Sequence, residues 1–298
     1  RDRMVVSWQD ALDSDCVVAT IERYTRPSSY QGHPAMKPPS GRAARRLAKK
    51  GGKSAPLTIA DVASRVAKAA VKGVDKTVAA RGKRILTSYL QTAQSHGLPV
   101  KEIVAEMASG QAAWRLGHAV RDEILKSPPE AVQNAACTQG CAFCCILSGG
   151  EGGVITGFEA AQLHAAVAPL AGQPDGRAWH SSACPALDPE TRSCRAYDAR
   201  PMICRSFMST DADACARNAE GGAEKGAGLL GSHLDYLLIH ALSRQALKGI
   251  TQVHTYSMAA TADAAVTGTP MESGLAAARH KPSALEAACR DAVKAAQA

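Results

Sequence analysis

The chain has few aromatic residues and no long apolar run. Only three Phe, three Trp and six Tyr occur among 298 residues, whereas alanine is abundant. Strands favour aromatic and β-branched side chains, so this composition argues against a β-sandwich and favours closely packed helices. No apolar stretch approaches the roughly 18 residues that a membrane-spanning helix needs. We therefore predict a mainly α protein that does not associate with a membrane.

The start of the sequence also lacks a secretory signal, since no basic region is followed by an apolar stretch. The chain nevertheless contains ten cysteines. In a reducing compartment, clustered cysteines are more often metal ligands than disulfides. We therefore expect a cytoplasmic protein in which the cysteines bind a metal.

The formal net charge of +8 is concentrated near the N-terminus. Residues 36–56 carry seven basic side chains and no acidic one. Such a run could contact nucleic-acid phosphates without reading sequence, but it has no interleaved aromatics on which bases would stack. We favour a solvated tail over a nucleic-acid module, and we predict that residues 1–56 form a disordered basic leader.

Helical periodicity begins at Leu57, where Thr58 and Asp61 resemble an N-terminal capping box. Apolar residues at helical spacing then predict a helical segment over 57–127, with four helices that end before Pro128. A cysteine-cluster metal-binding domain is predicted over 128–210, and a second helical segment over 211–298. Residues 172–227 look loop-like, and the glycine-rich stretch after the first cysteines predicts one short strand. The expected fold is a helical bundle with a loop-rich cysteine-cluster metal site.

Four cysteines lie within nine residues, in the sequence CTQGCAFCC that starts at Cys137. Adjacent cysteines seldom form a disulfide, because the small ring strains the peptide. Three more cysteines follow at intervals of ten residues, in a proline-rich passage that cannot stabilise itself by burial alone. Thiolates select zinc, iron–sulfur clusters or Cu(I) over hard cations. The candidate metal ligands are Cys137, Cys141, Cys144, Cys145, Cys184, Cys194 and Cys204.

The choice between zinc and iron is open from the residues alone. Structural zinc sites commonly use two CxxC pairs, and this chain has one, Cys141 and Cys144. Irregular spacing and an adjacent pair favour an iron–sulfur cluster. Arg195, Arg200 and Arg205 would stabilise thiolates in either case.

The cysteine pattern resembles the YkgJ-type cysteine-cluster family over residues 133–210. The resemblance is carried by C-x3-C-x2-C-C and, after a gap of about forty residues, by Cys194, Tyr197, Arg200-Pro201 and Cys204-Arg205. It implies a zinc- or iron-chelating domain built by the seven cysteines, and it implies little about a reaction. We expect Tyr197 to shield the metal, and Arg205 to donate to a ligand sulfur or an anion.

A weaker similarity links Cys137, Cys141 and Cys144 to the radical-SAM cluster motif. Those enzymes need a βα barrel, and the downstream sequence lacks the strand formers for one. The sequence therefore predicts a metal-binding protein that holds a zinc ion or an iron–sulfur cluster. The alternative is an iron–sulfur oxidoreductase or protein-modifying enzyme that uses the cluster.

The remaining cysteines and two histidines have simpler interpretations. Cys289, among alanines of the last predicted helix, is expected to be a small buried residue, and Cys16 has no assigned role. Cys215 could join the site, but we favour a separate position. His233 and His240 lie seven residues apart on one predicted helix, and we expect them to be solvated.

Overall fold

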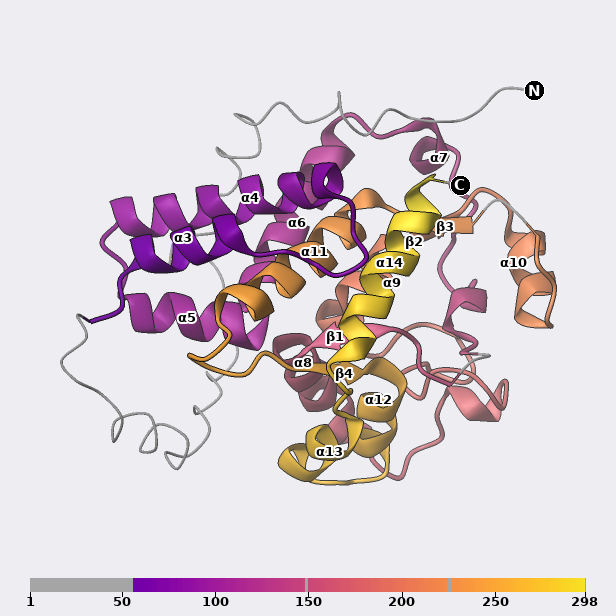
Figure 1. Cartoon of the computed structure of the whole chain (residues 1–298). Helices are drawn as coiled ribbons and strands as arrows, with labels where there is room; N and C mark the ends of the chain where they lie inside the picture. Colours follow the sequence, from indigo (N-terminus) through magenta and orange to yellow (C-terminus); the bar gives the residue numbers. More distant parts are fainter. Residues whose placement is uncertain (1–55, 148–149, 225–226, 298) are drawn as a thin grey trace.

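The computed structural model describes residues 56–147, 150–224 and 227–297, and this part of the chain is mainly α-helical, which confirms the prediction (Figure 1). Cys16 and the basic run, apart from its last residue, lie outside the described residues. The strands of the described part are three residues long and form two two-stranded sheets. A βα barrel therefore does not occur in that part of the chain.

The N-terminal helices form a bundle that begins where the sequence predicts it. The Thr58 hydroxyl accepts a hydrogen bond from the Asp61 amide at 3.1 Å, and the Asp61 carboxylate accepts one from the Thr58 amide at 2.9 Å. The capping box is thus confirmed, and it satisfies amides that the first turn leaves free. The four helices are α3 (Ile59–Lys68), α4 (Lys76–Ser95), α5 (Val100–Ser109) and α6 (Gln111–Lys126).

Two helices from the C-terminal part of the chain complete this first core. The long helix α11 (Gly231–Ala246) packs against α4 and α6, and α14 (Ser283–Gln297) packs against α11 (Figure 1). Gly82 lets α4 approach α11 closely, because a Cβ at Gly82 would lie only 3.2 Å from the Cβ of Leu238 on α11. The predicted segment boundaries at 127 and 210 stay a prediction, but helices from both sides of them share one core.

A second core lies beside the bundle and is organised by a small sheet. Strand β1 (Val154–Thr156) pairs antiparallel with β4 (Thr255–Ser257), and Ile155 faces Tyr256. Strand β1 confirms the short strand expected after the glycine-rich stretch, whereas its partner lies about a hundred residues later. The helices around this sheet are α8 (Gly157–Val167), α12 (Met258–Val266) and α13 (Met271–Ala278).

The cysteine-bearing segments run along the edges of both cores. The expectation that residues 172–227 are loop-like is wrong at the helix α10 (Ala212–Ala219). The Asp211 carboxylate accepts a hydrogen bond from the Ala214 amide at 2.9 Å and caps this helix. None of the helices in the described ranges has the length and apolar character that a bilayer crossing requires. The short elements here are α7 (Glu130–Gln133), η1 (Phe143–Cys145), η2 (Ala168–Leu170), η3 (Gly176–Ala178), η4 (Tyr197–Ala199), α9 (Met202–Ser206), β2 (Phe207–Ser209), α10 (Ala212–Ala219) and β3 (Ala227–Leu229).

Candidate metal centre

The first cysteine segment folds into a tight turn. Gly140 and Ala142 adopt left-handed backbone conformations, with φ of 79° and 54°. Such a conformation is unfavourable for alanine, which marks the turn as constrained by its surroundings. The 3-10 turn η1 follows and brings the sulfurs of Cys144 and Cys145 to 4.0 Å from each other. Adjacent thiols are thus presented together and remain unbridged.

Backbone pairing brings the first distal cysteine to this turn. The Cys184 amide donates to the Cys145 carbonyl at 2.8 Å, and the Leu147 amide donates to the Ser182 carbonyl at 2.7 Å. A β-bridge between Ile146 and Ala183 lies between these two bonds. Two segments about forty residues apart therefore lie side by side at the cysteines.

A small hairpin returns the next cysteine to the same place. The Asp188 amide donates to the Ser193 carbonyl at 2.9 Å, and the Asp188 carboxylate accepts from the Thr191 amide at 2.8 Å. A β-bridge pairs Leu187 with Cys194. The hairpin lets a proline-containing stretch satisfy its backbone groups locally. It also places Cys194 beside Leu187, three residues after Cys184.

The last distal cysteine lies on the short helix α9, which a buried carboxylate holds. Glu159 is 1% exposed, and its Oε1 accepts from the Met202 amide in the first turn of α9 at 2.7 Å. Its Oε2 accepts from the Thr156 amide at 3.0 Å and from the Tyr236 hydroxyl. A carboxylate at two helix N-termini is favourable for both helices. Glu159 thus fixes the helix that carries Cys204.

The thiols of the inner group interact through their charges. Burial raises the pKa of Cys184 to about 11, with contributions from the charges of Cys194 and Cys144. Burial raises the pKa of Cys204 further, and the charges of Cys184, Cys194 and Cys144 add to that rise. For Cys145, the hydrogen bond with Cys144 and burial raise the pKa, with contributions from the Cys184 and Cys204 thiolates. These five thiols are therefore near neighbours in space.

Cys144 differs from its neighbours because its pKa is lowered to about 7. The hydrogen bond with Cys145 is the main cause, and the positive charge of Arg200 adds to it. Cys144 is also exposed. The adjacent pair thus combines an exposed thiol that ionises easily with a half-buried thiol that does not.

The arginines between the distal cysteines have mixed roles. Burial raises the pKa of Cys194, while the charges of Arg200, Arg205 and Arg195 oppose that rise. The Arg205 guanidinium donates to the main-chain carbonyls of Arg200, Tyr197 and Asp198, so it clamps the loop before α9. Stabilisation of thiolates is therefore shared among the three arginines.

Tyr197 lies on the surface, in contrast to the expectation that it shields the site. Its side chain is 61% exposed, and the Arg200 guanidinium lies 5.0 Å from the ring centre. The cation–π contact fixes the direction of the arginine, which lies close enough to lower the pKa of Cys144. Tyr197 therefore acts on the cysteines through Arg200.

Cys137 and Cys141 belong to an outer group, which also includes Cys215. The Cys137 sulfur accepts from the Ser209 amide at 3.4 Å. Burial raises its pKa, and the thiolates of Cys141, Cys144 and Cys215 add to the rise. Cys215 lies on α10, which packs against η1. The sequence offered Cys215 as a possible member of the site but favoured a separate position, and the structure corrects this because α10 returns Cys215 to the turn.

The thiols are neighbours, but they are not arranged as a ready-made coordination sphere. Among the described residues, no three His, Cys, Asp or Glu side chains converge closely enough to hold an ion as they stand. Their chemistry still fits a soft metal, because sulfur atoms dominate the inner group and cationic arginines balance thiolate charge. Since ligand thiols must lose their protons, metal binding here would release protons and strengthen as pH rises.

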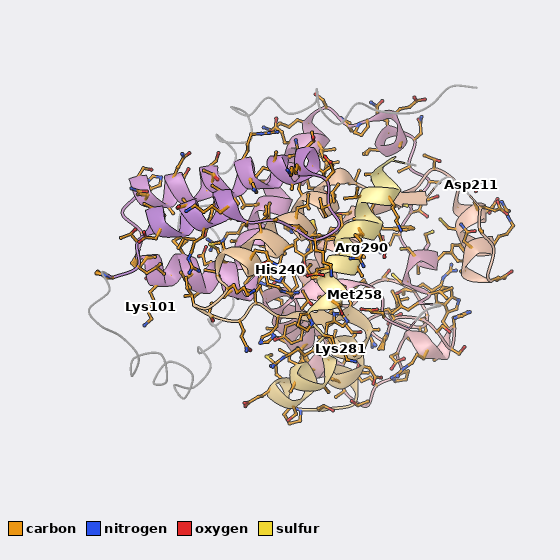
Figure 2. The ribbon with its side chains drawn as sticks, in the orientation of Figure 1. Lys101, Asp211, His240, Met258, Lys281 and Arg290 are labelled. Carbon is orange, nitrogen blue, oxygen red and sulfur yellow. The ribbon has the colours of Figure 1, made fainter. Side chains whose placement is uncertain are left out.

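The histidines that the sequence singled out are buried, so the expectation that they are solvated is wrong. His233 and His240 are 4% and 1% exposed, and burial lowers the pKa of each to about 4. Figure 2 shows the position of His240. His240 Nε2 lies 3.1 Å from the His254 carbonyl oxygen. They belong to the interior of the bundle, while Cys289 is fully buried, as predicted.

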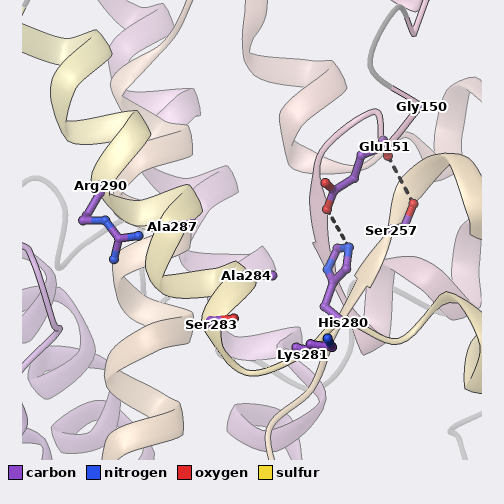
Figure 3. Close-up of a pocket in the computed structure, with 9 residues that line it drawn as sticks. All are labelled: Gly150, Glu151, Ser257, His280, Lys281, Ser283, Ala284, Ala287 and Arg290. Carbon is purple, nitrogen blue, oxygen red and sulfur yellow. Dashed lines mark hydrogen bonds and ion pairs between the residues drawn. The ribbon is translucent and has the colours of Figure 1, made fainter.

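A cavity of about 650 Å³ opens next to the segment that follows the cysteine turn (Figure 3). Glu151 forms an ion pair with His280 across it at 2.6 Å, and Lys281 and Arg290 add positive charge to its lining. None of the cysteines in the described part of the chain lines this cavity. The ion pair ties the loop after the turn to the chain between α13 and α14.

Comparison with known proteins agrees with the geometry of the cysteines. Residues 136–223 match a family model named CxxCxxCC and described as a "putative zinc- or iron-chelating domain". This segment is similar to a metal-chelating family. The match confirms the resemblance predicted from the cysteine pattern, and it spans all seven predicted ligands together with Cys215. No curated protein and no solved structure matches the chain.

Proposed function

We propose that this chain is a metal-binding protein whose inner thiols hold zinc or iron, the iron as an iron–sulfur cluster. The ligands are drawn first from Cys144, Cys145, Cys184, Cys194 and Cys204. Cys137 and Cys141 act as outer ligands beside them. The observation that supports this proposal most is the backbone pairing of Cys145 with Cys184, which joins the two cysteine segments.

Metal binding also explains why four thiols gather in or against the second core, where Cys184 is buried and Cys145, Cys194 and Cys204 pack against it. Burial disfavours the thiolate form of Cys145, Cys184 and Cys204, so metal-free protein keeps them protonated at neutral pH. These thiols would lose their protons when they bind a soft metal, and they would then share it as ligands. The bound metal would then add its binding free energy to the folding of the 137–204 segment.

Elemental analysis of protein purified without air is the direct test. We expect stoichiometric zinc or iron in the wild type, with a brown visible absorption if iron–sulfur is present. Cys145→Ser and Cys204→Ser should lose most of the metal, whereas Cys289→Ala, at the buried thiol of the other core, should retain it. Wild-type protein that contains neither metal and binds neither on addition would refute the proposal.

A second candidate function is an iron–sulfur enzyme, and the exposure of Cys144 favours it. An exposed ligand next to a half-buried one leaves a position that a substrate can approach. Cys144→Ser should then retain iron while the visible spectrum becomes sensitive to added small thiols. Loss of iron to the same extent as in Cys145→Ser would count against this candidate.

A further inference from the structure

The sulfur of Met258 lies next to the sulfur of Cys204, although 54 residues separate them in the chain. The thiol donates to the thioether, and the distance from Cys204 Sγ to Met258 Sδ is 3.3 Å. Met258 is 5% exposed and is the first residue of α12 (Figure 2). Two sulfurs that share a tetrahedral metal, at about 2.3 Å each, lie roughly 3.8 Å apart. The pair is thus close to the separation that a shared metal requires.

The loop after the cysteine turn fixes the backbone of Met258. The Met258 amide donates to the Gly153 carbonyl at 3.1 Å, and the Ala259 amide donates to the Glu151 carbonyl at 3.1 Å. The Ser257 hydroxyl also donates to the Glu151 carbonyl, as Figure 3 shows. The start of α12 is therefore tied to the segment that carries the first cysteines.

Gly152 leaves the space that the thioether occupies. A Cβ at this glycine would lie 2.6 Å from the Met258 Cε, and the backbone there is left-handed, with φ of 64°. The left-handed backbone disfavours a larger residue at this position, and a Cβ there would also displace the end of the Met258 side chain. The methionine is thus enclosed beside Cys204.

A thioether is a neutral, soft donor, which gives it a preference among metals. Thioether ligands suit Cu(I), whereas zinc sites use thiolate, imidazole or carboxylate. We propose that Met258 supplies a thioether ligand to the metal held at Cys204 and shifts the preference of this site towards a soft cation such as Cu(I). This inference rests on the proposed function, because it takes metal binding at Cys204 as given.

The test compares Met258→Leu with Met271→Leu, a matched change in the same core at a methionine for which the structure records no thiol contact. Leucine keeps the volume and the apolar character of the side chain. Competition with chromophoric chelators under anaerobic conditions gives the Kd of Cu(I) and of Zn(II) for each protein. We expect Met258→Leu to weaken Cu(I) binding by about ten- to a hundredfold and to leave Zn(II) binding unchanged. Met271→Leu should change neither.

Copper-edge X-ray absorption provides a second measurement, the number of sulfur neighbours of Cu(I), which a change in packing alone would not alter. The number of sulfur neighbours of Cu(I) should fall by one in Met258→Leu. An unchanged Cu(I) affinity and sulfur number would overturn the inference and leave the proposed function standing. Equal losses for Cu(I) and Zn(II), with lower stability of the metal-free protein, would assign Met258 to packing and also overturn it. Wild-type protein that binds neither Cu(I) nor Zn(II) and contains no iron would instead overturn the proposed function.

Discussion

Replacement of Glu159 tests whether a buried carboxylate holds the helix of Cys204. The carboxylate lies at the N-termini of both α8 and α9 and accepts hydrogen bonds from Thr156, Met202 and Tyr236. Glu159→Ala removes every acceptor, while Glu159→Gln keeps the shape and one oxygen. The two variants therefore separate the loss of hydrogen bonds from the loss of charge.

The structure sets the size of the expected effect. Alanine leaves four donors without their carboxylate: the amides of Thr156 and Met202 and the hydroxyls of Thr156 and Tyr236. The Thr156 amide keeps its bond to the Tyr236 oxygen, so three of the four are left unpaired. Each buried donor left unpaired costs about 1–3 kcal/mol. Removal of a buried carboxylate recovers part of its desolvation, so we expect Glu159→Ala to lose about 3–5 kcal/mol of unfolding free energy. Glu159→Gln should lose about 1–2 kcal/mol, because its amide still accepts one of these bonds.

The pH dependence of stability provides an independent sign. Burial raises the pKa of Glu159 above its ordinary value of 4.5, against the hydrogen bonds that lower it. The folded state thus binds this proton more tightly than the unfolded state does. Protonated Glu159 therefore contributes to stability below pH 4.5, and this contribution is lost as pH rises through the pKa of Glu159 in the folded state. Glu159→Gln should remove this part of the slope.

Urea denaturation of metal-free protein, followed by circular dichroism at several pH values, measures both quantities. Glu272→Ala, at an exposed carboxylate in the first turn of α13, is the control and should stay within about 0.5 kcal/mol of the wild type. In the metal-loaded protein, Glu159→Ala should also weaken metal binding. If Glu159→Ala matched the control in stability, or if Glu159→Gln were less stable than Glu159→Ala, the clamp on α9 would be refuted.

Two further predictions concern the backbone and the thiols of the site. A Cβ on Gly176 would lie 2.4 Å from the Cys184 carbonyl oxygen, so Gly176→Ala should lower the unfolding free energy in urea by about 1–3 kcal/mol and weaken metal binding. Gly228→Ala is the control, because a Cβ there would lie in open space. Equal stability of the two variants would contradict this packing. Alkylation of metal-free protein by iodoacetamide should show a Cys144 rate that rises with pH around a pKa of about 7, since only the thiolate reacts, and Cys145→Ala should move that midpoint upwards because it removes the main hydrogen bond. A midpoint near 9 in both proteins would refute the second prediction.

Local signals in the sequence predicted the helices and the cysteine set. The capping box of Thr58 and Asp61 fixes where the bundle begins, and it involves residues three apart. The cysteine motif likewise depends on short spacings, because one backbone turn can bring the sulfurs of closely spaced cysteines together. Features of this kind are readable because the chain between the partners has little freedom.

Contacts between distant residues could not be predicted in the same way. Glu159 reads as an ordinary residue of a capping box, and only the fold brings Tyr236 and the Met202 amide to its carboxylate. His233 and His240 looked like surface residues, since the sequence does not reveal that α11 is surrounded on several sides. Met258 carries no motif at all. In each case the partner lies far away in sequence, so burial and pairing follow from tertiary packing.

The parts that support the candidate centre extend beyond the segment that matches the family model. Tyr236 donates to Glu159 from α11, and Met258 contacts Cys204 from α12, while both lie outside residues 136–223. Without α11, the Glu159 carboxylate would lose one of its donors and become exposed to water, which weakens its hold on α9. Strand β1 would also lose its only partner in the described part of the chain, β4. The matched segment therefore provides the thiols, and the helices that follow it provide the surroundings that hold Cys204 in position.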